Sequence, residues 1–133
     1  MAGINAELFM GSNGRLVGSF LAAGAVVKNA LVVLSADDTV SATTANDSEL
    51  VIGKAIFAIS AADVTAGKTV DIELFGRAVV ELLAGGTVTR GLRQTPVGTA
   101  GKITNVGASP DPGAVIGIAM KSGVDGDVIP VLI

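Results

Sequence analysis

The sequence predicts an all-β protein, a small barrel or sandwich of short strands with two pseudo-repeated halves and an extended N-terminal arm. Apolar and polar residues alternate along short segments such as "TVDIEL" at 69–74, and a period of two is typical of a strand. Glycine-, aspartate- and serine-rich turns separate these segments at intervals of about 8 to 12 residues, as in sandwiches and barrels. In addition, "VIGKAIFAIS" at 51–60 nearly recurs as "VIGIAMKSG" at 115–123.

The composition fits one domain with a core of small aliphatic side chains. The chain has 133 residues, of which 50% are hydrophobic and 3% aromatic, so Val, Ile, Leu and Ala must fill the interior. Residues 1–22 lie outside the repeat, and we interpret them as the arm. Residues 23–133 are predicted to form a single β-rich domain with pseudo-repeats at about 23–74 and 85–133.

The two halves align as a series of matching segments, which predicts the same four short strands in each half. Chance similarity among strands rich in Val and Gly is the alternative. The aligned pairs are "GAVVKNALVVL" (24–34) with "GTVTRGLRQTP" (86–96), "DTVSATT" (38–44) with "GKITNVG" (101–107), "IGKA" (52–55) with "IGIA" (116–119), and "GKTVDIEL" (67–74) with "GDVIPVLI" (126–133).

We expect the two halves to share one core, with both "VIG.A" segments as buried strands at matching positions. Apolar positions of the first half would face those of the second half. The residues expected there are Val26, Val33, Ile52 and Ile56 from the first half and Val88, Ile103 and Ile116 from the second.

The segment "ELFGRAVVELLAGG" at 73–86 allows two interpretations. As a helix it would place Glu73, Arg77 and Glu81 four residues apart, which favours ion pairs along one face. Gly76 costs about 1 kcal/mol inside a helix relative to alanine, however, and the β-branched Val79 and Val80 favour strands. We therefore predict two strands that meet at a bend near Gly76.

The residue types exclude most catalytic and metal chemistry. The chain has no cysteine and no histidine, so the usual ligands of zinc and the usual general base at neutral pH are absent. Acidic pairs occur on expected loops, but without the spacing of a calcium-binding loop. We predict solvated turn residues there, no catalytic, cofactor or metal site, and no enzymatic activity. These pairs are Asp37 with Asp38, Asp47 with Glu49, and Asp125 with Asp127.

One segment matches a loose phosphate-loop pattern. In "AADVTAGKT", Ala62 is followed after four residues by Gly67, Lys68 and Thr69. Such a loop binds phosphate only where a helix begins directly after the lysine, because the amide groups of its first turn must converge on the anion. Here the alternating "TVDIELF" follows. We therefore predict a turn between two strands, with no bound nucleotide.

Charge and hydropathy exclude further classes of partner. The net charge is −3, and lysine and arginine form no cluster that would neutralise a nucleic-acid backbone. The apolar runs fall short of the roughly 20 residues of a membrane-spanning helix, and the N-terminal sequence does not follow the pattern of a signal peptide. Since the apolar excess indicates surface that association would bury, we expect an oligomer.

The ordered set of segments resembles the small capsid decoration, or cement, proteins of tailed bacteriophages. The resemblance covers about residues 23–133 and rests on "AGAVVKNALVVLSADDTVSATTANDSELVIGKAI", "TAGKTVDIELFGRAVVEL", "GGTVTRGLRQT", "GKITNV", "AVIGIAMKSG" and "DGDVIPVLI". It implies a β-rich homotrimer on the outside of an expanded head that clamps neighbouring capsid subunits, with an N-terminal segment that reaches the shell. Asn29 replaces a glycine frequent in the family, whereas Gly91 keeps it in the second half. Asparagine tolerates the same left-handed conformation.

We therefore expect a structural protein made in the host cytoplasm and located on the outer surface of the virion capsid. Its partners would be the major capsid protein and further copies of itself, without nucleic acid or membrane. The alternatives are a β-rich surface binding or adhesion module and, less favoured, a nucleotide-binding protein. The candidate capsid contacts are residues of the arm: Ile4, Leu8, Phe9, Met10, Arg15, Leu16 and Phe20.

Overall fold

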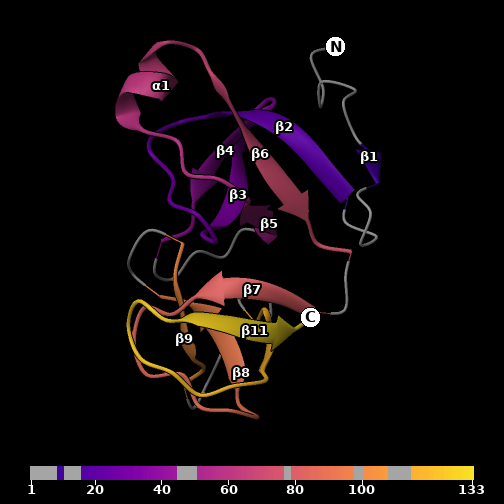
Figure 1. Cartoon of the computed structure of the whole chain (residues 1–133), viewed down its shortest axis with the longest axis vertical. Helices are drawn as coiled ribbons and strands as arrows, with labels where there is room; N and C mark the ends of the chain where they lie inside the picture. Colours follow the sequence, from indigo (N-terminus) through magenta and orange to yellow (C-terminus); the bar gives the residue numbers. More distant parts are fainter. Residues whose placement is uncertain (1–8, 11–15, 45–50, 77–78, 98–100, 108–114) are drawn as a thin grey trace.

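The computed structural model describes residues 9–10, 16–44, 51–76, 79–97, 101–107 and 115–133. Within these ranges the chain is all-β, as predicted, apart from one short helix, and its strands form two sheets, one above the other in Figure 1. The elements of the upper sheet and its helix are β1 (Phe9–Met10), β2 (Leu16–Ala22), β3 (Leu31–Ala36), β4 (Thr39–Ala42), β5 (Val51–Ala55), α1 (Ala61–Thr65) and β6 (Thr69–Leu74). The strands of the lower sheet are β7 (Val79–Leu83), β8 (Arg93–Pro96), β9 (Ile103–Asn105), β10 (Gly117–Ala119) and β11 (Val128–Leu132).

The upper sheet closes into a barrel, which we call the first barrel. Its strand order is β1-β2-β4-β3-β5-β6, and β2 also pairs antiparallel with β6 from Leu16 opposite Leu74 to Leu21 opposite Thr69. The β2–β4 pair is parallel. The short strand β1 pairs with the start of β2 outside the closed ring.

The lower sheet repeats this topology, and we call it the second barrel. Its order is β7-β11-β10-β8-β9, and a parallel bridge between Ala84 and Ile103 joins the end of β7 to β9. When β2, β3, β4, β5 and β6 are matched with β7, β8, β9, β10 and β11, each strand keeps its neighbours and their directions. The predicted duplication is confirmed, and it includes a fifth strand, β2 or β7, that the alignment did not detect.

The recurring "VIG.A" segment reflects a close approach of two backbones. A β-carbon on Gly53 of β5 would collide with the carbonyl oxygen of Glu73 on β6, and one on Gly117 of β10 would collide with that of Leu132 on β11. The two segments therefore occupy matching positions, and glycine is required at both. The predicted burial of both segments is only partly correct, because Ile118 of β10 is 40% exposed.

A second matched position lies in the turn before β3 and β8. Asn29 has a φ of 67° and Gly91 a φ of 86°, both in the left-handed region. Their amide groups donate to Ala55 O and Ala119 O, at 2.8 Å in each case. Asn29 thus replaces glycine without changing the backbone, as expected.

The single shared core predicted from the sequence is wrong, because the described residues form two core clusters, one in each barrel. A sheet that closes on itself directs alternate side chains into its own interior, so they meet only one another. There are exceptions: Leu31 of β3 belongs to the cluster of the second barrel, and Val51 of β5 and Phe75 pack against it. Of the predicted core residues, Val26 and Ile52 belong to the first cluster, Val88, Ile103 and Ile116 belong to the second, Val33 is buried outside both, and Ile56 is half-buried.

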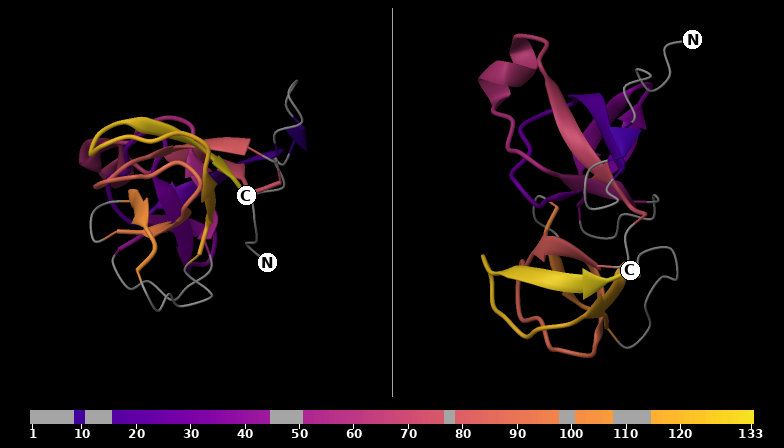
Figure 2. Two further views of the ribbon diagram at one scale, coloured as in Figure 1. Left: turned by 90° about the horizontal axis from the view of Figure 1, so that it is seen from below. Right: turned by 45° about the vertical axis from the view of Figure 1, so that its right-hand side comes forward.

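Two backbone hydrogen bonds join the barrels. Leu31 N donates to Gly101 O at 2.8 Å, and Gly101 N donates to Thr43 O at 3.0 Å. Gly101 has a φ of 79°, and a β-carbon there would collide with Ala30 and the Leu31 backbone. The barrels consequently stack closely along the long axis of the molecule, as the right-hand view of Figure 2 shows.

The described residues of the 73–84 segment include the end of β6, a bend at Phe75 and all of β7, which agrees with the predicted strands and bend near Gly76, and Arg77 lies outside the described residues. β6 ends at Leu74 in the first barrel and β7 begins at Val79 in the second, so the bend lies where the chain crosses between barrels. At the N-terminal end, residues 16–22, which the sequence assigned to the arm, form β2 and pair with β6 along six residues.

We predict that Gly53→Ala and Gly117→Ala each destabilise the protein by about 3 kcal/mol, because the added methyl group meets a backbone carbonyl rather than a movable side chain. Urea denaturation followed by far-ultraviolet circular dichroism measures this, since the chain has no Trp or Tyr to report by fluorescence. Gly24→Ala is the matched control, because its added methyl group has nothing within 4 Å. Equal stability of all three variants would contradict this explanation of the repeated segment.

We predict that Gly91→Ala costs about 1–2 kcal/mol, whereas Gly91→Asn costs less than about 1 kcal/mol. A β-carbon at Gly91 has nothing within 4 Å, so the difference reports the left-handed backbone alone. The same denaturation experiment compares the two variants. An asparagine variant as unstable as the alanine variant would show that Asn29 is not the equivalent of Gly91.

Candidate functional site

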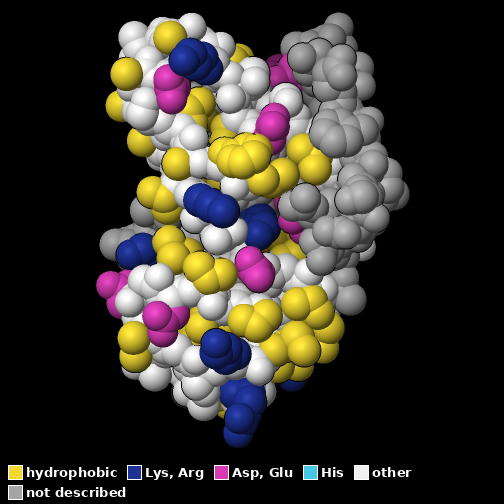
Figure 3. Space-filling model, viewed as in Figure 1, with side chains coloured by type: hydrophobic (Ala, Val, Ile, Leu, Met, Phe, Trp, Pro, Cys, Tyr) yellow, Lys and Arg dark blue, Asp and Glu magenta, His cyan; other side chains and the backbone are white. Residues whose placement is uncertain are grey.

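The surface in Figure 3 carries hydrophobic side chains among charged side chains of both signs. Across the described ranges, no group of three or more potential metal-ligating side chains comes together. The described helix is too short to cross a membrane.

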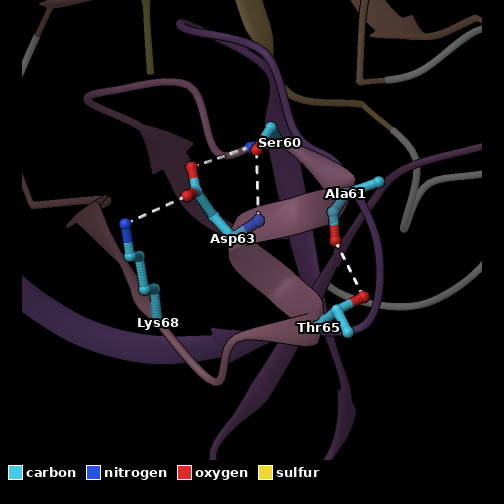
Figure 4. A network of polar contacts seen from close by, with 5 residues as sticks. All are labelled: Ser60, Ala61, Asp63, Thr65 and Lys68. Carbon is cyan, nitrogen blue, oxygen red and sulfur yellow. Dashed lines mark hydrogen bonds and ion pairs between the residues drawn. The ribbon is translucent and has the colours of Figure 1, made fainter.

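The phosphate-loop-like segment folds as the helix α1 followed by a tight turn (Figure 4). The Ser60 hydroxyl accepts a hydrogen bond from Asp63 N at 3.1 Å, and the Asp63 carboxylate accepts one from Ser60 N at 3.4 Å, so the two residues form a capping box. The helix ends before Gly67, whose φ is 76°, and β6 begins at Thr69. The helix thus precedes the lysine, in the opposite order to a phosphate loop.

The polar groups of this turn satisfy one another. Lys68 Nζ lies 3.2 Å from Asp63 Oδ1. The hydrogen bond from Lys68, followed by those from the Ser60 side chain and backbone, holds the pKa of Asp63 below its usual value. The sequence predicted a turn here, and the structure adds the one-turn helix. Its signal was the serine at position 60 with an acidic residue three positions later.

The acidic pairs on the described loops have structural partners or turn positions. Asp125 Oδ1 lies 3.2 Å from Lys102 Nζ, and Asp127 Oδ2 accepts a hydrogen bond from Val124 N at 2.9 Å. Asp37 and Asp38 form the turn between β3 and β4. Asp47 and Glu49 lie outside the described residues. Glu73 and Glu81 lie in different barrels, with Glu73 buried and Glu81 exposed.

The candidate capsid contacts separate into three groups. Ile4, Leu8 and Arg15 lie outside the described residues. Phe9 and Met10 form β1, whose backbone pairs with Val17 and Leu16. Leu16 is half-buried in β2, and Phe20 is 1% exposed in the core of the first barrel. As a side chain in the core, Phe20 is not available to a partner, so its assignment as a contact is corrected.

The structure also reveals an exposed surface that the sequence analysis did not identify. The outward side chains of β7, β11 and β10 are mostly apolar, and we call this surface the apolar face. Its sequence signal was "VIPVL" at 128–132, which is apolar in both strand phases, whereas the matching "TVDIE" at 69–73 alternates. The residues of the apolar face are Val79, Leu83, Ile118, Val128, Pro130 and Leu132.

Comparison with known proteins identifies the fold. No protein-family model and no curated protein sequence matches the chain. Among solved structures, it is similar to the N base of the head fibre protein gp8.5 of bacteriophage phi29, with a TM-score of 0.70 and 18% sequence identity. The match covers 90% of this chain and 93% of the other. The two proteins therefore share a fold over nearly their whole lengths.

We predict that Mg-ATP at about 5 mM leaves the melting temperature unchanged, because the amide groups and the lysine of the 60–69 turn are already engaged. Differential scanning calorimetry with and without nucleotide tests this. A rise in melting temperature that Lys68→Ala abolishes would show that the turn binds phosphate after all.

Proposed function

We propose that the protein is a structural component of a phage head, a decoration or cement protein that binds the outside of the expanded shell as a trimer. The observation that carries this proposal is the fold shared with the base of a phage head fibre over 90% of this chain. The two barrels offer a β-rich body of a kind suited to binding rather than to chemistry. The sequence resemblance to decoration proteins supports the same conclusion independently of the fold.

Stabilisation of a shell requires only differential binding. A ligand stabilises the state that it binds more tightly, so a protein that binds the expanded head better than the unexpanded or broken head protects the expanded form. The major capsid protein is the proposed partner. Contacts to neighbouring capsid subunits would then act as a clamp.

The N-terminal segment is the proposed point of contact. The pairing of β1 with Leu16 and Val17 brings the backbone at Phe9 and Met10 onto the first barrel outside its closed ring. An extended segment beside a barrel is well placed to add backbone hydrogen bonds to a strand edge of a partner. Three such segments on one trimer raise the effective local concentration to about millimolar once the first has bound, so weak individual contacts are sufficient.

We predict that deletion of residues 2–14 leaves a folded oligomer that binds expanded heads about 100-fold more weakly, because the avidity of the arms is lost. Cosedimentation with purified expanded heads measures binding, and the melting temperature of the heads measures protection. Circular dichroism and native mass of the truncated protein serve as the control, since β2 to β11 are retained. Full binding and undiminished protection would show that the arm is a passive tail.

A further inference from the structure

The duplicated fold allows each surface position of one barrel to be compared with its equivalent in the other. Ser19 on β2 faces Asp71 on β6, and at the matching position Glu81 on β7 faces Pro130 on β11. The same registers pair Lys54 with Glu73 and Ile118 with Leu132. The polar outward positions Thr69, Asp71, Glu73 and Lys54 of the first barrel thus correspond to Val128, Pro130, Leu132 and Ile118 of the second, although Glu73 and Lys54 are buried whereas Leu132 and Ile118 are exposed.

This replacement is not required by the fold. The first barrel builds β5 and β6 with polar outward side chains, and there the Ser19 hydroxyl of β2 donates to Asp71 Oδ1 at 2.7 Å. On β2 itself, Val17 and Leu21 are apolar like their equivalents Val79 and Leu83, so the replacement concerns β11 and β10. In the second barrel Val128, Leu132 and Ile118 are 44%, 41% and 40% exposed, although none of them contributes to the core. Grouped apolar side chains left in water are typical of surfaces that bind another protein.

The apolar face is continuous across three strands. Val79 on β7, Leu132 on β11 and Ile118 on β10 are direct neighbours in register. The next outward row pairs Glu81 with Pro130, and the row beyond it pairs Leu83 with Val128. Side chains that face one another across paired strands project from the same side of the sheet. Figure 3 shows these hydrophobic side chains gathered over β7 and β11 of the lower barrel, toward the C-terminus.

Charges of opposite sign flank this face. Glu81 is exposed on β7, the outermost strand of the face on one side, between Val79 and Leu83, and Arg93 is exposed on β8, next to Ile118 at the other side. Within the described residues neither side chain forms an ion pair. In a cyclic assembly whose axis runs along these strands, the β7 side of one copy meets the β8 side of the next, so Glu81 and Arg93 pair across every interface.

We infer that the apolar face is the surface by which copies of this chain associate, with Glu81 of one copy paired to Arg93 of its neighbour. The apolar side chains exclude water and the charges select the relative orientation of the copies. This inference deepens the proposed function, since it assigns the surface of the proposed trimer. It does not depend on which residues contact the capsid.

The experiment is a charge-exchange cycle on the full chain, with association measured by light scattering and native mass over micromolar concentrations. Glu81→Arg and Arg93→Glu each place like charges at the interface and should weaken association by roughly tenfold or more, and the double variant should restore it. Lys28→Glu and Asp37→Arg are matched charge reversals in turns of the first barrel, away from the face, and should leave association unchanged. Ile118→Ser tests the apolar part and should weaken association without affecting folding, because this side chain is exposed.

Circular dichroism melting of each variant confirms that it is folded. Single variants that associate like the wild type, a double variant no better than either single, or a wild type that is monomeric throughout would each overturn the inference. Binding of the wild type to expanded heads is measured in parallel. If the wild type associates through this face but does not bind expanded heads, the proposed function is contradicted and the assignment of the association surface is unaffected.

Discussion

Closure of each sheet on itself is the constraint from which the rest of the structure follows. To close, β5 must pass close to β6 and β10 close to β11, and only a residue without a side chain fits at Gly53 and Gly117, opposite the carbonyl groups of Glu73 and Leu132. Closure then turns alternate residues inward and leaves the others to solvent or partners. The two clusters of small aliphatic side chains, the sparse use of aromatic residues and the repeated glycine segment are consequences of this one geometry.

Two closed barrels in one chain need a junction, and this is made largely by backbone. Gly101 donates to Thr43 O and accepts from Leu31 N, while the Leu31 side chain enters the cluster of the second barrel. Backbone hydrogen bonds and the Leu31 side chain connect the barrels, and Val51 and Phe75 also pack against the cluster of the second barrel. The junction therefore uses the first residue of β3 twice, once for its backbone and once for its side chain.

The local features were predictable from the sequence, and the features that depend on closure were not. The alternation in "TVDIEL", the bend near Gly76 and the equivalence of Asn29 with Gly91 rest on short-range rules of backbone conformation and burial, and the structure confirms them. We expected a single shared core because the chain has only 133 residues. A five-stranded sheet can close on itself within about half that length, however, so each half has its own core. The assignment of residues 16–22 to the arm failed because β2 has few identities with β7, although both occupy the same position in their barrels. The apolar face was missed because an outward apolar side chain on a strand resembles a core residue until the facing direction is known.

Duplication explains how one barrel of the pair can change its surface while the fold is retained. The barrel backbone tolerates either chemistry on its outward positions, so once two copies exist, one can keep a polar exterior while the other changes. In the first barrel polar outward residues of β5 and β6 have partners within the chain, in contacts such as Ser19 with Asp71 and Lys54 Nζ with Asn29 Oδ1 at 2.9 Å. In the second barrel Ile118, Val128 and Leu132 are exposed to water. This exposure costs roughly 25 cal/mol for each Å² of apolar surface left unburied. An exposed apolar surface at positions where the sister barrel is polar is best explained by association with a partner.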